Sequence, residues 1–68
     1  MNIKERRLKA KITQAQLAQK MGVDPSTVVK WETGKAYPRA LDIPKIADAL
    51  GCSIDALFGR EEEEHDEV

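Results

Sequence analysis

The side chains of this 68-residue sequence that are best suited to do chemistry lie just after Asp24. Helical spacing places Val28 and Trp31, three residues apart, on one face of a helix. The opposite face then carries Pro25, Ser26, Val29 and Lys30. A lysine can donate to O6 and N7 of guanine, a serine can donate or accept, and valine and proline can pack on a thymine methyl group. These residue types favour a helix that reads base edges, although Lys30 could instead contact phosphate or solvent.

A second set of residues could hold the phosphate backbone. Gln14 lies at the predicted start of a helix, where a side-chain amide and free backbone N–H groups can bind a phosphate oxygen. Further candidates near the reader helix are Thr13, Thr27, Thr33, Lys35, Tyr37 and Arg39. Lys35 and Arg39 are the strongest because they carry positive charge. Gln14 could instead be an ordinary surface residue, and Tyr37 could pack its ring against the core.

Two short helices with clear start and stop signals must position these side chains. Thr13 can cap the first of them while Gln16 reaches back, which forms a capping box, and Gly22 ends this helix in a left-handed conformation. Asp24 caps the second helix, and Pro25 fits its first position because no N–H is needed there. Two helices joined by such a turn form the unit that places one helix in the major groove of DNA.

Three more helices are expected around this pair. The first runs from Asn2 or Ile3 to about Ala10 and turns Ile3, Leu8 and Ala10 inward. Another covers Leu41 to Leu50 with Asp42 as its cap, and a short last one begins after Ser53 and carries Ile54, Leu57 and Phe58. No strand pattern or internal repeat is visible. The sequence therefore predicts an all-α, compact five-helix domain.

The net charge of −1 averages two very different regions. Residues 61–68 carry six acids, whereas residues 1–60 hold eleven basic and six acidic residues, a net charge of +5. A basic body favours phosphate as a partner, and a block of like charges is typically unfolded. We therefore expect a domain over residues 1–59 and an acidic, disordered tail over 60–68. The tail could aid solubility, compete with DNA for the basic face, or contact a partner protein.

Several classes of protein do not fit the sequence. The single Cys52 excludes an internal disulfide and a multi-cysteine zinc site, and His65 stands alone in the acidic segment. Outside the acidic tail, no cluster of acids, His/Cys set or nucleophile pair indicates an enzyme, and no cofactor or metal site is expected. No stretch approaches the roughly 18 apolar residues of a membrane span, so a cytoplasmic location is expected.

The residues from Ile3 to Phe58 resemble the Cro/phage-repressor (Xre-type) helix-turn-helix family. The resemblance is carried by Thr13-Gln14, Leu17-Ala18, Gly22-Val23, Ser26-Thr27-Val28, Trp31-Glu32, Gly34-Lys35, Pro38, Ile43, Lys45-Ile46-Ala47, Leu50-Gly51 and Ser53 to Phe58. It implies a repressor-like DNA-binding domain whose helix-turn-helix is formed by helices 2 and 3.

The resemblance also assigns roles to single residues. It implies that Gln14 contacts a phosphate and that Arg7 and Glu32 form a structural ion pair between the first and third helices, unless both are unpaired surface charges. Arg6 departs from the leucine usual in the family. Lys11 departs from a usual glycine, so the turn that it occupies is expected to be mildly strained.

The expected function is a sequence-specific transcriptional regulator, a repressor or autoregulator that binds an inverted-repeat operator in double-stranded DNA as a homodimer. By analogy, the dimer surface would include Cys52, Ala56 and Phe58. The main alternative is an antitoxin-like or other protein-interaction module of the same fold. The operator, the regulated genes, the sign of regulation, the dimer's strength and any protein partner stay open.

Overall fold

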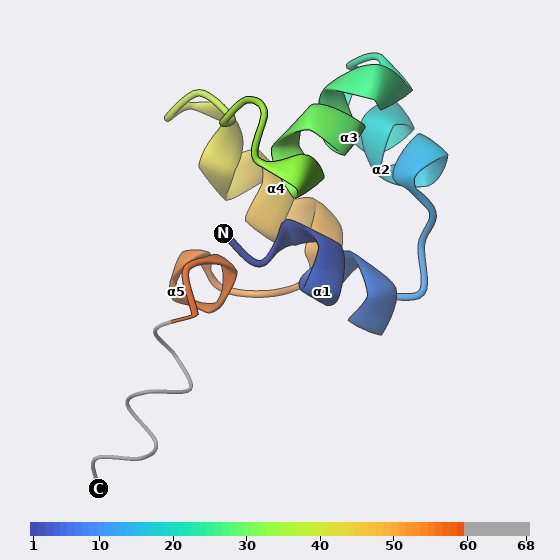
Figure 1. Ribbon diagram of the computed structural model, residues 1–68. Helices are drawn as coiled ribbons and strands as arrows, with labels where there is room; N and C mark the ends of the chain where they lie inside the picture. The colour runs from blue at the N-terminus through green and yellow to red at the C-terminus, as the bar shows by residue number, and fades with distance from the viewer. Residues whose placement is uncertain (60–68) are drawn as a thin grey trace, which may run out of the picture.

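The computed structural model describes residues 1–59, and Figure 1 shows how the helices are arranged. They are α1 (Ile3–Lys9), α2 (Gln14–Met21), α3 (Pro25–Thr33), α4 (Asp42–Leu50) and α5 (Ile54–Leu57). No strand occurs among residues 1–59. The prediction of an all-α, five-helix domain is confirmed, whereas the predicted disordered tail, residues 60–68, lies outside the described residues.

Helices α2 and α3 lie together at one end of the domain, at the top of Figure 1. Helix α4 passes through the middle and contacts α2 and α5, while α1 and α5 lie at the opposite end. Among the described residues, no helix is long and apolar enough to span a bilayer.

Every helix contributes one large, fully buried side chain to a shared core. These five side chains are Ile3, Leu17, Val28, Ile46 and Leu57. Trp31 joins them at 6% exposure. Burying an aliphatic side chain of this size contributes about 1.5–3 kcal/mol, so each helix is fixed to the others mainly through this cluster.

The ends of α2 and α3 are set by the signals seen in the sequence. The Thr13 hydroxyl accepts from the N–H of Gln16 at 3.0 Å, and Oε1 of Gln16 accepts from the N–H of Thr13 at 2.8 Å. Oδ1 of Asp24 accepts from the N–H of Ser26 at 2.9 Å, one residue after Pro25 enters the helix. Gly22 ends α2 in the left-handed region, with φ of 72°. The predicted capping box, Asp24 cap and Gly22 stop are confirmed.

The prediction that Leu8 faces the core is wrong. Ile3 and Arg7, four residues apart, form the buried face of α1, and Leu8 is 55% exposed. Successive helical residues are separated by about 100°, so a residue five positions after Ile3 points far from the face that Ile3 defines. The buried position that Leu8 was expected to fill is occupied by a guanidinium instead.

The prediction that Asp42 caps the fourth helix is also wrong. Leu41 is the cap residue and makes no side-chain cap hydrogen bond, while Asp42 is the first helical residue. The turn before the helix supplies the acceptors, because Asp42 N–H donates to the carbonyl of Arg39 at 2.8 Å and Ile43 N–H to that of Ala40 at 3.3 Å. A side-chain cap is therefore not needed at this end.

Candidate nucleic-acid interface

The outward face of α3 is the surface that the sequence assigned to base reading. Pro25, Ser26 and Lys30 are exposed and Val29 is 39% exposed. Val28 lies on the inward face and is completely buried. Because the core holds one side of the helix, the other side projects as a rigid ridge whose side chains face solvent.

Ser26 contacts the Asp24 cap, in addition to its predicted role in base reading. Its backbone N–H, with a smaller contribution from its side chain, hydrogen-bonds to the Asp24 carboxylate and holds the pKa of that carboxyl below its usual value. Lys30 adds a weaker Coulombic effect in the same direction. Asp24 thus fixes the start of the ridge and partly engages Ser26, which leaves Lys30 as the freer of the two polar side chains.

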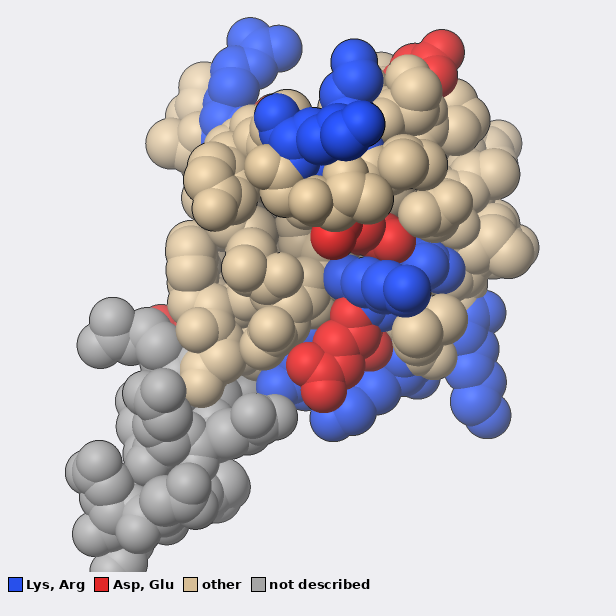
Figure 2. Space-filling view, viewed as in Figure 1, with Lys and Arg blue, Asp and Glu red and all other residues tan. Residues whose placement is uncertain are grey.

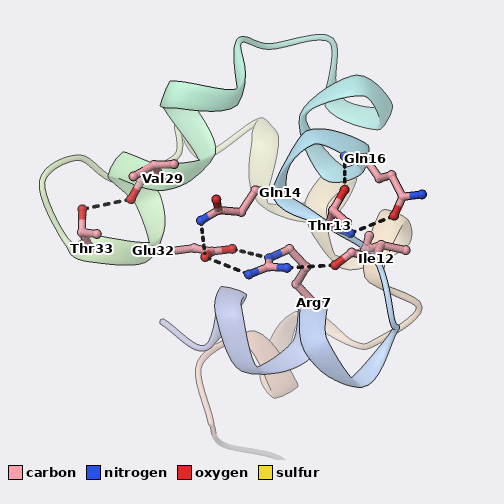
Figure 3. Close-up of polar contacts among 8 residues, drawn as sticks. All are labelled: Arg7, Ile12, Thr13, Gln14, Gln16, Val29, Glu32 and Thr33. Atoms are coloured by element: carbon pink, nitrogen blue, oxygen red, sulfur yellow. Dashed lines mark hydrogen bonds and ion pairs between the residues drawn. The ribbon is translucent and has the colours of Figure 1, made fainter.

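The Glu32 carboxylate, in the last turn of α3, connects α3 to α1 and α2, as Figure 3 shows. Nε of Arg7, from α1, donates to Oε2 at 2.7 Å, and Nη2 donates to Oε1 at 3.3 Å. Nη1 of the same guanidinium donates to the carbonyl of Ile12 at 2.9 Å. The side chains of Arg7 and Glu32 are only 9% and 3% exposed, so the pair is a buried structural element.

Gln14, at the start of α2, donates from Nε2 to Oε1 of Glu32 at 3.0 Å. A primary amide carries two N–H groups, so one of them remains for a phosphate oxygen. The contact holds the Gln14 amide against Glu32. Gln14 is itself the first residue of α2, and a helix leaves its first N–H groups without intrahelical partners. The arrangement suits a phosphate site, and Gln14 is also a structural link between α2 and α3.

An open hollow of about 360 Å³ lies between α3 and the segment that follows it. It brings together the predicted base reader Lys30 and three predicted phosphate binders, which are Thr27 from α3 and Tyr37 and Arg39 from the segment after it. Its lining consists of Val23, Thr27, Lys30, Trp31, Ala36, Tyr37, Pro38, Arg39 and Asp42. Lysine and arginine at its edge suit an anionic ligand, and the carboxylate of Asp42 balances part of their charge.

The remaining phosphate candidates differ in what they can offer. The Thr33 hydroxyl donates to the carbonyl of Val29 at 2.9 Å, so it has no spare donor for phosphate in this conformation. Thr13 uses a lone pair in the capping box but keeps its proton. Lys35 is exposed, and Tyr37 is 74% exposed and does not pack against the core edge.

The predicted dimer surface needs a correction at one position. The Ala56 side chain is completely buried, so it cannot contact a second copy. Cys52 is half-buried and packs against the core, whereas Phe58 is 47% exposed. Sequence reasoning missed another exposed apolar residue, Leu41, which is 82% exposed because it precedes α4 and is not part of the helix.

The structure describes no arrangement for metal chemistry. Within residues 1–59, no group of three or more His, Cys, Asp or Glu side chains could hold a metal ion.

This arrangement of α2, turn and outward-facing α3 defines a helix-turn-helix protein. The family model described as "Helix-turn-helix" matches residues 3–57, and the chain belongs to this family, in agreement with the Xre-type resemblance of its sequence. No solved structure was found to match the chain.

Curated proteins that resemble the chain include two regulators. One is the cryptic phage CTXphi transcriptional repressor RstR of Vibrio cholerae, 44% identical over 64 residues, which cover 88% of this chain and 57% of the repressor. Another is an uncharacterized HTH-type transcriptional regulator of Archaeoglobus fulgidus, 40% identical over 62 residues, which cover 91% of this chain and 87% of that protein.

A third relative has the name of an enzyme. The (S)-2-hydroxypropylphosphonic acid epoxidase of Streptomyces wedmorensis is 41% identical over 56 residues, which cover 81% of this chain but only 28% of the epoxidase. The chain thus spans little more than half of the repressor and less than a third of the epoxidase.

Proposed function

We propose that this protein is a sequence-specific DNA-binding transcriptional regulator in which α3 reads base edges in the major groove. The observation that carries the proposal is the outward, polar face of α3, held at a fixed angle by the contacts of Glu32 to α1 and α2. Lys30 is the main discriminating side chain, Ser26 a less selective one, and Val29 and Pro25 offer apolar contact to thymine. The similarity to a phage repressor supports a repressor or autoregulator, acting in the cytoplasm.

Phosphate contacts would set the register of the helix on the duplex. The start of α2 supplies Gln14, Thr13 and free backbone N–H groups on one side of the reader helix. On the other side, Lys35 is exposed and the hollow presents Arg39, Tyr37 and Thr27. Contacts on both sides of a recognition helix fix its position, and they carry no sequence information themselves.

Two copies on an inverted repeat are the expected arrangement, because one helix-turn-helix buries little DNA surface. The two reader helices would lie about one helical turn, roughly 34 Å, apart. We place the contact between copies at Phe58 and the accessible part of Cys52.

Titration of labelled duplex DNA with the protein at increasing salt tests DNA binding itself. The proposal predicts that the logarithm of the binding constant falls linearly with the logarithm of the salt concentration, because lysine and arginine displace counterions from phosphate. A protein that binds no duplex even at low salt would overturn it.

A second candidate function is a protein-interaction module of the same fold, as in an antitoxin. The observation in its favour is the exposure of two large apolar side chains in the segment after α3, Tyr37 at 74% and Leu41 at 82%. A binding assay tests this candidate. It would be favoured if the full chain retains an unrelated protein, if Leu41→Ser no longer retains it, and if Lys30→Ala still does.

A further inference from the structure

The hollow between α3 and the segment that follows it contains one acidic residue, Asp42, beside its basic ones. Asp42 is half-buried and lines the hollow together with Lys30 and Arg39. Its backbone is held in place because its N–H donates to the carbonyl of Arg39 at 2.8 Å. Among residues 1–59, no hydrogen bond or ion pair uses the Asp42 side chain. A negative charge without a partner in the domain therefore lies in a hollow whose basic residues suit an anion.

The acids that precede Asp42 in the proposed DNA-binding elements do have partners. Residues 13–39, which include α2, α3 and most of the segment after them, carry four basic and two acidic residues. One acid is Asp24, which caps α3, and the other is Glu32, whose carboxylate is bound by side chains from α1 and α2. Figure 2 shows basic side chains at the end of the domain where α2 and α3 lie, at the top of the view. Asp42 is therefore the acid that can oppose an incoming phosphate at the hollow.

A structural role of Asp42 can be separated from an effect on ligands. Asp42 is the first residue of α4, so its carboxylate lies at the positive end of the helix dipole and modestly stabilises the helix. An uncharged residue would lose this stabilisation, but the loss would not tighten the binding of an anion. A gain in affinity for phosphate on removal of the charge would therefore report on the hollow and not on the helix.

We propose that Asp42 weakens the binding of phosphate in the hollow. One like charge near a bound phosphate changes the affinity about fivefold in water. The extension to DNA rests on the function proposed above: if the hollow holds a backbone phosphate, Asp42 lowers the affinity for duplex DNA whatever its sequence, since phosphate contacts carry no sequence information. Asp42 thus limits the strength of DNA binding, whereas α3 sets the base preference.

The test compares wild type with three variants of the full chain. Asp42→Asn removes the charge from the hollow, and Asp42→Glu retains it. Asp48→Asn is the matched control, because Asp48 is exposed on the same helix and does not line the hollow. Each protein is titrated at low and high salt with inorganic tripolyphosphate, followed by the NMR amide signals of Lys30 and Arg39. Fluorescence anisotropy then measures binding to two labelled duplexes of unrelated sequence.

The proposal predicts that Asp42→Asn binds tripolyphosphate and both duplexes about fivefold more tightly than wild type at low salt, and that high salt removes the gain. Asp42→Glu and Asp48→Asn should stay close to wild type. An equal gain in both asparagine variants, no gain in Asp42→Asn, or no binding of tripolyphosphate by any protein would overturn it. A gain on one duplex alone would also overturn it, because it would make Asp42 a reader of bases. If wild type binds no duplex, the proposed DNA-binding function fails, and the tripolyphosphate titrations still decide whether Asp42 opposes phosphate.

Discussion

The guanidinium of Arg7 and the carboxylate of Glu32 meet at 2.7 Å although 25 positions separate them in the sequence. The contact fastens α1 to the last turn of α3, and Gln14 extends it to α2 through the same carboxylate. The orientation of the reader helix is therefore fixed by a buried polar junction as well as by the apolar core. This junction connects the stability of the domain to its proposed function.

Arg7→Ala should destabilise the domain by about 3–5 kcal/mol, because it leaves the Glu32 carboxylate buried without its cation. Urea unfolding followed by tryptophan fluorescence measures the loss, since Trp31 is the single tryptophan. Lys4→Ala, on the exposed side of the same helix, is the matched control and should change little. The double variant Arg7→Met/Glu32→Leu should recover much of the loss. A double variant as unstable as Arg7→Ala would contradict the assignment of the cost to an uncompensated charge.

Lys30→Ala and Lys35→Ala separate base reading from phosphate binding. Lys30→Ala should weaken binding to the preferred site more than binding to random duplex, by about 1–3 kcal/mol of discrimination. Lys35→Ala should weaken both alike and reduce the salt slope by about one. Fluorescence anisotropy titrations on the two DNAs measure both effects. Equal losses for both variants on both DNAs would contradict the assignment of α3 as the reader.

Lys11→Gly should stabilise the domain by up to about 1 kcal/mol. Lys11 has φ of 62°, a left-handed conformation that glycine adopts without steric cost but other residues rarely do. Lys9→Gly, which removes the same side chain from the last position of α1, should destabilise it instead. Thermal unfolding of the two variants measures the difference. A loss of stability in Lys11→Gly equal to that in Lys9→Gly would show that the turn is not strained.

The Asp24 cap should make stability depend on pH in the acidic range. Hydrogen bonds from Ser26 lower the pKa of Asp24 below 3.8 in the folded protein. A carboxyl whose pKa is lower in the folded state stabilises that state fully above the unfolded pKa and loses this effect as the pH falls through the folded pKa. Asp24→Asn keeps a capping acceptor but does not titrate there.

Urea unfolding from neutral to acidic pH should therefore show wild type as the more stable protein at neutral pH. This advantage over Asp24→Asn should disappear below the folded pKa. A difference between the two proteins that is constant with pH would contradict the role assigned to the carboxylate.

The parts of the fold that the sequence predicts are those set by local chemistry. Thr13 with Gln16, Asp24 with Pro25, and Gly22 act on neighbouring backbone groups, so their effect is visible in a few consecutive residues. Leu8 was assigned wrongly because hydrophobicity alone placed it inside, whereas Arg7 takes that face with a partner 25 residues away. Asp42 was assigned wrongly because the preceding turn supplies the acceptors through its carbonyls, which any residue type carries.

In the candidate site, too, features set by neighbouring residues were predicted, and features set by tertiary packing were not. The exposure of Pro25, Ser26, Val29 and Lys30 follows from the spacing of Val28 and Trp31, and it is confirmed. Their contact with bases stays a prediction. The hollow after α3 was not predicted, because it depends on how the segment from Ala36 to Arg39 folds back over the helix. The burial of Ala56 likewise depends on how α5 packs, which its four helical residues do not reveal.

Selection of binding sites from random duplex DNA at near-physiological salt tests the central claim most directly. A dimer whose α3 helices read bases predicts enrichment of an inverted repeat whose two halves are centred about one helical turn apart. Lys30→Ala should alter or relax the preference at specific positions of each half. Absence of any enriched sequence, with the protein folded and active in non-specific binding, would contradict the claim that α3 reads DNA sequence.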